Sequence, residues 1–264
     1  MITSLANKTI KDAAALKKSG ERKESGLILI DGLREIEMAL RAQVEIISLF
    51  YCPELILDKI GVLDKISLDK RIEVSEIILK KICYKENPEG FLAIAKPKDK
   101  KLSDLKLGDE ALIVVLENVE KPGNLGGIIR TAYAAGVGAI ILNSNQTDIY
   151  NPNVIRASEG HVFTQNIISS SVAETIKWLK HNKIKSFGAA TIGAKIYTEI
   201  DLSGRAAIIL GSEAEGLSTQ WLEEADQLIK IPMKAGIDSL NVSVSAAIII
   251  YEALRQRKAA FDNK

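Results

Sequence analysis

Short apolar runs alternate with helical stretches along the chain, and they fall into two groups. The first group predicts three strands, at Leu27–Ile30, Ile46–Tyr51 and Phe91–Ala95. Helical periodicity lies between them at Leu33–Ala42 and Ser75–Cys83, where Ser75 is placed to cap the helix. This part of the sequence predicts a small α/β domain.

The second group has continuous apolar runs, which are typical of strands buried on both faces. These predicted strands are Ala111–Leu116, Ala139–Leu142, Ser186–Ala190, Ala206–Leu210 and Gln227–Ile231. Because helical stretches alternate with them, they predict a mainly parallel sheet covered on both faces. Ligands bind such sheets beyond the carboxyl ends of the strands, so the loops that follow the strands are candidate sites.

A polar, lysine-rich segment from Pro97 to Gly108 separates the two groups, as expected of a linker. We therefore predict a first domain at residues 1–98, a linker at 99–108 and a second domain at 109–264. Residues 1–106 carry 20 Lys and Arg against 17 Asp and Glu, whereas residues 107–264 carry 15 against 17. The positive excess in the first part hints at contact with nucleic acid.

Other features of the sequence exclude several classes of protein. The two cysteines (Cys52 and Cys83) are too few for a disulfide scaffold, and we expect inert core thiols. Neither they nor His161 and His181 have metal-ligand spacing, so we expect no metal. No apolar run reaches the roughly 20 residues needed to span a bilayer, and no signal peptide is evident, so we expect a cytoplasmic protein without membrane association.

The first candidate loop runs from Asn118 to Arg130, with a predicted tight turn at Pro122-Gly123-Asn124. Arg130 follows in a helix among apolar neighbours, where a guanidinium group is costly to bury unless it meets an anion. A simpler interpretation is that Arg130 extends to the surface or pairs with Glu117 or Glu120.

The second candidate loop is Gly211-Ser-Glu-Ala-Glu-Gly216. Neither this loop nor the first has the glycine spacing of a Rossmann fingerprint or a P-loop, which argues against hydride transfer and NTP hydrolysis. Its glycines allow a ligand to approach the backbone closely. Glu213 is placed to orient Arg130 or to accept a hydrogen bond from a substrate, although a solvated turn carboxylate is the simpler alternative.

The third candidate loop starts at Ile231 and leads into a helix predicted from about Asn241 to Lys258. Ser239 or Asn241 can cap this helix, either as ordinary capping or with backbone N–H groups left for a polar ligand. The helix is apolar almost all round until Arg255, so it must be buried on most sides. A second subunit could supply part of that burial, and we expect an oligomer.

The three loops together resemble motifs of the SpoU (TrmH-like) family of RNA ribose 2′-O-methyltransferases, which belongs to the SPOUT class. The resemblance covers residues 109–258. Its motifs are similar to Asn124–Arg130, to Gly211–Gly216, and to Ile231-Pro-Met with Ser239-Leu-Asn-Val-Ser243. The resemblance implies an α/β trefoil-knot domain with a mainly parallel sheet, an exception to the general absence of knots.

The resemblance also implies a cofactor and roles for individual residues. S-adenosylmethionine would bind in the knot, and no metal would be needed. The residues implied for the cofactor pocket are Thr191, Leu210, Gly211, Ile231 and Leu240. Arg130 would act on the ribose 2′-hydroxyl. The active site would lie at or near the interface of a homodimer, and its other implied residues are Asn124, Glu213, Ser239 and Asn241.

The first domain resembles, more loosely, the small α/β RNA-binding domain often found in this family, which is similar to ribosomal proteins. Lys11, Arg22 and Arg34 are the implied RNA-binding residues. The presence of this domain makes ribosomal RNA of the 23S type the expected substrate rather than tRNA, because relatives that act on the tRNA D-loop commonly lack the domain. One departure is Lys121-Pro122, where many relatives have Asp-Pro, and this weakens any assignment of the substrate by analogy.

The alternatives are a tRNA methyltransferase, a catalytically silent RNA-binding assembly factor, and a small-molecule enzyme that uses the glycine loops for a nucleotide. Intact Asn124, Arg130, Glu213 and Asn241 argue against a silent protein, and the basic first domain argues against a small-molecule enzyme.

Overall fold

The computed structural model describes residues 1–56, 60–143, 148–191 and 194–257. The chain divides into two compact units. Unit 1 contains residues 1–98 and 148–164, and unit 2 contains residues 99–147 and 165–264. The units differ from the predicted boundaries because residues 148–164 pack in unit 1 and the predicted linker belongs to unit 2.

Unit 1 is built around a four-stranded mixed sheet with the order β1-β4-β2-β3. Its strands are β1 (Ile28–Asp31), β2 (Glu45–Tyr51), β3 (Arg71–Glu73) and β4 (Phe91–Lys96). β4 is antiparallel to β1 and β2, and β3 is parallel to β2. The helices of this unit are α1 (Lys8–Ala15), α2 (Ser19–Ser25), α3 (Leu33–Arg41), α4 (Pro53–Ile56), α5 (Glu76–Ile82), α7 (Pro152–Ala157) and α8 (His161–Thr164). The predicted small α/β domain is confirmed.

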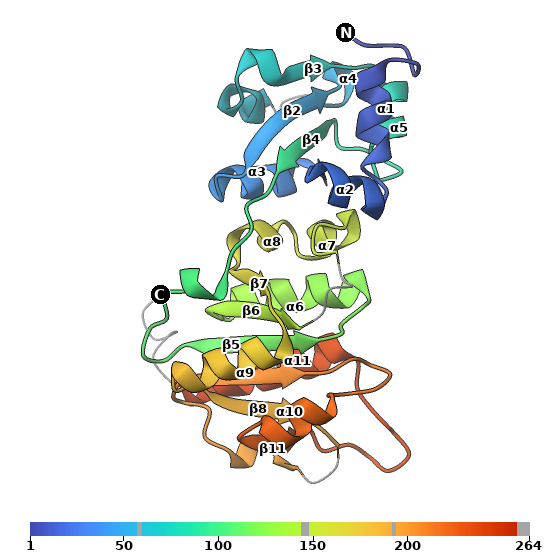
Figure 1. Cartoon of the computed structure of the whole chain (residues 1–264). Coiled ribbons are helices and arrows are strands. Elements are labelled where there is room, and N and C mark those ends of the chain that lie inside the picture. Colours follow the sequence, from blue (N-terminus) through green and yellow to red (C-terminus); the bar gives the residue numbers. More distant parts are fainter. Residues whose placement is uncertain (57–59, 144–147, 192–193, 258–264) are drawn as a thin grey trace. The chain divides into compact units, whose positions relative to one another are not determined.

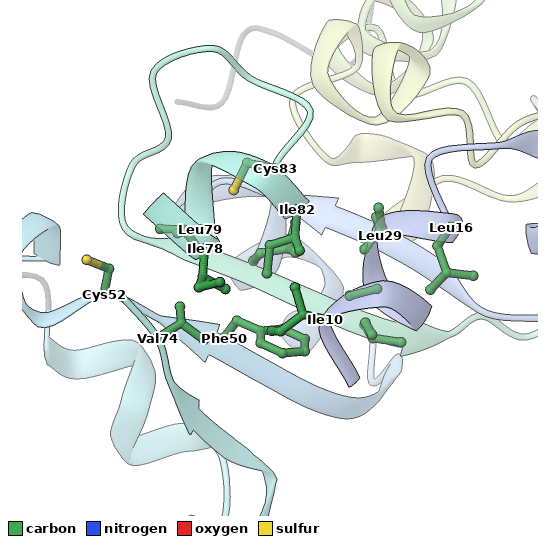
Figure 2. Close-up of a cluster of buried hydrophobic side chains, with 13 residues drawn as sticks. Ile10, Leu16, Leu29, Phe50, Cys52, Val74, Ile78, Leu79, Ile82 and Cys83 are labelled. Atoms are coloured by element: carbon green, nitrogen blue, oxygen red, sulfur yellow. The ribbon is translucent and has the colours of Figure 1, made fainter. Parts of the chain in front are cut away.

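The core of unit 1 lies between α1, α5 and the sheet. Ile10 of α1, Phe50 of β2 and Ile78 of α5 are fully buried in one apolar cluster, which also contains Cys52 and Cys83 (Figure 2). Both cysteines are free thiols, as predicted. Ser75 is the N-cap residue of α5, but its side chain makes no capping hydrogen bond.

Unit 2 contains a seven-stranded sheet in which every pairing is parallel (Figure 1). The strand order is β7-β6-β5-β10-β8-β11-β9. The strands are β5 (Leu112–Glu117), β6 (Ala139–Asn143), β7 (Ile167–Ser169), β8 (Lys185–Ala189), β9 (Lys195–Ile196), β10 (Ala206–Leu210) and β11 (Gln227–Lys230). The helices are α6 (Pro122–Ala134), α9 (Val172–His181), α10 (Thr219–Glu224) and α11 (Val242–Gln256). The sequence did not predict β3, β7 and β9, which have two or three residues each.

Both faces of this sheet are buried, as the sequence predicted. Ile113 and Val115 of β5 point to one face and join a cluster with Trp221 of α10 and residues of α9. Val114 and Leu116 alternate with them and therefore point to the other face, and they are also fully buried. On unit 2, α6 and α11 pack on each other.

Two helix boundaries bear on the functional site. Pro122, Gly123 and Asn124 form the first turn of α6, so the prediction of a separate tight turn was wrong. Proline at the first position of a helix supplies a suitable φ angle and has no N–H to leave unpaired, which explains the early start. Asn241, one of the two caps that the sequence offered, caps α11 through its side chain, which accepts from the backbone N–H of Ser243. The predicted end of this helix at Lys258 lies outside the described residues.

The predicted linker is not a free tether. Leu102, Leu105 and Leu107 are half-buried and pack against the core of unit 2, and Lys100 donates hydrogen bonds to Gln165 and Asn166. Within the described ranges, none of the helices has both the length and the apolar character needed to cross a membrane.

Candidate functional site

The three candidate loops lie at the carboxyl ends of strands in the unit 2 sheet. Leu116 of β5 pairs with Leu210 of β10, so the loops that follow these two strands begin side by side. The third loop follows β11, which is separated from β10 only by β8. The chain order reverses between β5 and β10, and parallel sheets bind ligands at the carboxyl ends of strands at such a switch point.

A chain of side-chain hydrogen bonds links the three loops. The amide nitrogen of Asn124 donates to Glu213 Oε1, and the amide nitrogen of Asn241 donates to Asn124 Oδ1 over 3.1 Å. Asn241 Oδ1 in turn accepts from the backbone N–H and the hydroxyl of Ser243, at 2.9 and 2.6 Å. The candidate residues Asn124, Glu213 and Asn241 therefore form one connected group, which the sequence brought together only through the resemblance.

The second loop is closed on itself. Ser212 and Gly216 exchange two backbone hydrogen bonds of 3.1 and 3.0 Å. A Cβ atom on Gly211 would lie 2.1 Å from the carbonyl carbon and oxygen of Gly216, so only glycine fits at this position. Beyond the loop, the backbone N–H of Ser218 donates to the buried Glu117 carboxylate over 2.8 Å. The position of Glu213 is fixed by this turn.

A pocket of about 680 Å³ lies between the carboxyl ends of β8, β10 and β11 and the start of α11. Its lining includes all five predicted cofactor residues (Thr191, Leu210, Gly211, Ile231 and Leu240) together with Glu213 and Ser239. Asn124, Arg130 and Asn241 lie outside this lining. A pocket of this size, lined by both apolar and polar residues, is suited to a nucleoside-sized ligand.

Several other lining residues were given no individual role by the sequence analysis. They include Ala189 at the end of β8, Met233 in the third loop, and Val242, Ser245 and Ile249 on α11. Ala189 could have been found from its place at the carboxyl end of a predicted strand. For Met233, Val242, Ser245 and Ile249, the only feature of the sequence that pointed to the pocket was their position in or after the third motif.

Arg130 is exposed on α6. A Cβ on Gly127 would lie 3.7 Å from Cβ of Ser243, so Gly127 marks the face of α6 that meets the start of α11. Asn124 and Arg130 are three residues before and after Gly127, and residues at this spacing are neighbours on a helix surface. Arg130 is thus next to the face of α6 that meets the start of α11.

No group of three or more His, Cys, Asp or Glu side chains that fits a metal ion is found among the residues the structure describes. The carboxyl ends of these strands carry a closed glycine turn, a pocket and a hydrogen-bonded set of amide and carboxylate groups.

Comparison with known proteins assigns the fold. Residues 111–251, more than half of the chain, match the model of the SpoU rRNA Methylase family. The chain belongs to this family. Residues 7–93 match a second model, the MRM3-like substrate binding domain. The SpoU match covers the sheet, the pocket and all three motifs, so the recognition made from the motifs is confirmed.

Individual SpoU relatives resemble the chain over almost its full length. It is 28% identical to the 23S rRNA (guanosine(2553)-2′-O)-methyltransferase RlmP of Bacillus subtilis, over 95% of this chain and 97% of that protein. Among solved structures, an RNA 2′-O ribose methyltransferase is 39% identical with a TM-score of 0.85, over 97% of this chain and 98% of that one. The AdoMet-bound rRNA methyltransferase from Sinorhizobium meliloti is 31% identical with a TM-score of 0.89, over 96% and 97%.

The SpoU motifs do not account for unit 1, where the three predicted RNA-binding residues differ in their placement. Lys11 is exposed on α1. Arg34 is exposed on α3 and forms an ion pair with Glu159. Arg22 is buried, with 4% of its side chain exposed, and its guanidinium group pairs with Asp148. The structure therefore does not support RNA contact by Arg22, because its charge is engaged inside unit 1.

Proposed function

We propose that this chain is an S-adenosylmethionine-dependent enzyme that methylates the 2′-hydroxyl group of a ribose in RNA, with ribosomal RNA of the 23S type as its substrate. The observation that carries this proposal is the hydrogen-bonded group of Asn124, Glu213 and Asn241 beside the pocket of a SpoU family member. RNA is favoured over a small molecule by the match of unit 1 to a substrate binding domain.

The pocket fits the proposed cofactor in size and in character. Its volume of about 680 Å³ is in the range of small-molecule sites, and the closed turn after Gly211 forms part of its lining. Thr191, Leu210, Gly211, Ile231 and Leu240 would hold S-adenosylmethionine, which supplies a methyl group on a sulfonium centre that is open to nucleophilic attack. The structure of the S. meliloti relative with AdoMet bound supports this choice of cofactor.

The active-site residues are assigned by what a ribose hydroxyl needs. This hydroxyl is a poor nucleophile at neutral pH, so its oxygen must be held in line and its proton weakened. Arginine is a poor base, and Arg130 therefore orients and polarises the hydroxyl while a neighbouring phosphate or carboxylate accepts the proton. Asn124 is held by Glu213 and Asn241, and Ser239 contributes a hydroxyl to the lining of the pocket.

The substrate proposal rests on unit 1 and on the relatives. The B. subtilis protein is named for methylation of 23S rRNA, and the similarity to it extends through both units. Lys11 and Arg34 are exposed cations on unit 1 and are proposed to contact phosphates. The trefoil knot and a cytoplasmic location stay predictions.

We further propose that the enzyme works as a homodimer through α11. Val244, Ile248 and Tyr251 recur at helical spacing along one side of this helix, and Val244 and Tyr251 have 47% and 50% of their surface exposed. Tyr133 of α6, which packs on α11, is also exposed at 44%. An exposed apolar stripe of this kind favours burial against a second copy, close to Arg130 and Asn241.

The deciding experiment measures transfer of labelled methyl from S-adenosylmethionine to unmodified 23S rRNA transcripts and, separately, to tRNA transcripts, followed by nucleoside analysis. A 2′-O-methyl nucleoside in the 23S rRNA is the expected result. Methylation of tRNA alone would refute the substrate assignment. A chain that binds the cofactor but methylates neither RNA nor ribosomal particles would instead be a silent RNA-binding factor.

Replacing Arg130 with Ala tests the catalytic assignment. Transfer should fall below detection while the dissociation constant for S-adenosylmethionine, measured by calorimetry, changes less than about twofold, because Arg130 lies outside the pocket lining. Arg205→Ala, which also removes an arginine from unit 2, is the matched control and should stay active. Turnover that survives in Arg130→Ala contradicts the role given to this residue.

A further inference from the structure

The segment of residues 148–164 leaves the SpoU sheet after β6 and returns to it at β7, yet it packs in unit 1. Helix α7 lies against β1, and helix α8 lies against α3. Gly160 allows this close approach. It has a φ of +78°, and a Cβ atom on it would lie 2.8 Å from Cβ of Met38 and 3.1 Å from Cα of Glu35.

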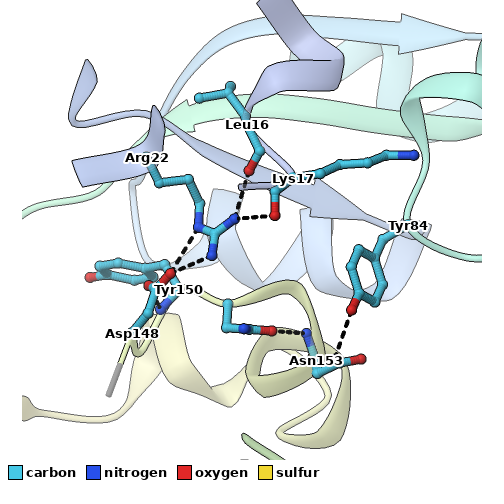
Figure 3. Close-up of polar contacts among 8 residues, drawn as sticks. Leu16, Lys17, Arg22, Tyr84, Asp148, Tyr150 and Asn153 are labelled. Atoms are coloured by element: carbon cyan, nitrogen blue, oxygen red, sulfur yellow. Dashed lines mark hydrogen bonds and ion pairs between the residues drawn. The ribbon is translucent and has the colours of Figure 1, made fainter. Parts of the chain in front are cut away.

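Arg22 holds the start of this segment from inside unit 1 (Figure 3). Its Nη1 donates to the backbone carbonyls of Leu16 and Lys17, at 2.7 and 2.8 Å, just beyond the end of α1. Its Nε donates to Asp148 Oδ2 over 2.9 Å, and its Nη2 pairs with the same oxygen. The other oxygen of Asp148 accepts from the backbone N–H of Tyr150 over 3.0 Å. Four of the five donors of a guanidinium group are thus used.

The segment lies outside the apolar cluster between α1, α5 and the sheet, which runs from Ile10 to Ile94 and contains no residue of 148–164. The segment's own apolar side chains, Val154, Ile155, Val162 and Phe163, are buried where α7 packs on β1 and α8 packs on α3. Tyr84 and Asn153 add one hydrogen bond of 3.0 Å at the edge of the segment. Loosening the segment at Asp148 would therefore leave the cluster between α1, α5 and the sheet in place.

The connectivity gives this attachment a consequence for catalysis. The chain passes between the two units three times, at residues 98–99, 147–148 and 164–165. While the segment is attached, all three passages tether the RNA-holding unit to the sheet that carries the active site. If the segment leaves unit 1, only the passage at residues 98–99 still joins the two units, and the effective concentration of a bound ribose at the active site falls.

We propose that Arg22 and Asp148 are a positioning pair for methyl transfer, which keeps residues 148–164 on unit 1 so that RNA bound there is presented to the active site. This role rests on the proposed function. It requires that loss of the pair lowers the transfer rate at saturating RNA without weakening the binding of RNA or cofactor. A role limited to the stability of unit 1 would weaken RNA binding instead.

Two full-length variants test the proposal by different routes. Asp148→Ala removes the partner of Arg22. Gly160→Ala pushes the segment away from α3 while the ion pair is left intact, which keeps the test valid if Asp148→Ala fails to fold. The control for backbone strain is Gly26→Ala, because Gly26 in unit 1 also has a positive φ, of +67°, but open space around its Cβ position. Asp12→Ala, at an exposed position of α1, is the control for charge.

For each variant, amide hydrogen exchange, affinity for an unmodified 23S rRNA transcript, affinity for S-adenosylmethionine and the transfer rate at saturating substrates are measured. We expect faster exchange confined to residues 148–164 and a transfer rate at least about tenfold lower in both test variants, with both affinities within about twofold of the wild type. The controls should behave as the wild type.

Three results would overturn the positioning role: unchanged exchange of the segment in both variants, a released segment with an unchanged transfer rate, or loss of RNA affinity together with faster exchange of β1 and β4. An active wild type separates these results from failure of the proposed function. A wild type that methylates no RNA overturns that function, and the positioning role falls with it.

Discussion

At the scale of residues, Asn124 uses both ends of its side-chain amide, and this fixes the direction in which the amide points. Its nitrogen donates to Glu213, and its oxygen accepts from Asn241. A carboxylate in the same place could still accept from Asn241, but it would face Glu213 with a like charge. The amide is therefore required by the contact with Glu213 rather than by the contact with Asn241.

Replacing Asn124 with Asp should reduce kcat/KM for RNA methylation about 10- to 100-fold at pH 8, since a hydrogen bond to a charged group contributes about 1.5–3 kcal/mol. Two facing carboxylates raise the pKa of one of them, and the protonated form can donate again. The loss relative to wild type should therefore shrink as the pH is lowered from 8 to 6, which the pH profile measures. Asn118→Asp, exposed in the same loop, is the control, and an Asn124→Asp enzyme with wild-type activity at pH 8 contradicts the argument.

The two thiols should be unreactive in the folded protein. Burial, assisted by the neighbouring Glu54 carboxylate, raises the pKa of Cys52 to about 11, and burial also raises the pKa of Cys83. Both thiols are thus protonated at pH 8, and only the thiolate reacts. Mass spectrometry after iodoacetamide treatment at pH 8 should find no alkylation of native protein and two modified cysteines after denaturation. Rapid labelling of native protein would show that unit 1 opens more readily than its burial implies.

At the scale of elements, the segment that joins the two patterned regions is predicted to stabilise unit 2. Leu105 packs half-buried against its core, so Leu105→Ala should lower the free energy of unfolding by about 1–2 kcal/mol, less than for a fully buried leucine. Urea denaturation followed by tryptophan fluorescence measures this change, since Trp221 lies in the same cluster. Lys106→Ala, at the adjacent exposed position, should change stability by less than about 0.5 kcal/mol. Equal effects of the two substitutions would mean that the segment is not held by its leucines.

The sequence predicted those elements whose signal is local. Continuous apolar runs located β5, β6 and β10, and the capping preference of Asn241 located the start of α11. The edge strand β9 has only Lys195 and Ile196, too few residues for any period to be seen. The attachment of residues 148–164 to unit 1, and the contact between Asn124 and Glu213, depend on tertiary packing between distant segments, which no local pattern records.

At the scale of the whole molecule, the exposed stripe of α11 predicts the oligomeric state. Tyr251→Glu places a charge in this stripe, where burial without a partner is costly, and should convert the proposed dimer into a monomer. Light scattering coupled to size-exclusion chromatography measures the mass of the particle. Ile77→Glu, at an apolar position of α5 that is 71% exposed, is the control and should leave the mass unchanged.

The same Tyr251→Glu variant also tests whether the active site depends on the second subunit. If α11 forms the interface near Arg130, methyl transfer should fall together with the loss of the dimer. A wild type that is monomeric at micromolar concentration would refute the dimer, and a fully active monomeric variant would place the whole active site within one chain.

The order of strands in the unit 2 sheet has a consequence for the way the protein is made. Leu112 begins β5, and its partner Ala206 in β10 is synthesised much later. Until then, one side of β5 is an unpaired apolar edge, the kind of edge that pairs with strands of other chains. The lining of the pocket extends along the chain to Ile249, so the pocket is complete only after this part of α11 has left the ribosome. The nascent chain is therefore most prone to aggregation in the interval between the synthesis of β5 and that of β10.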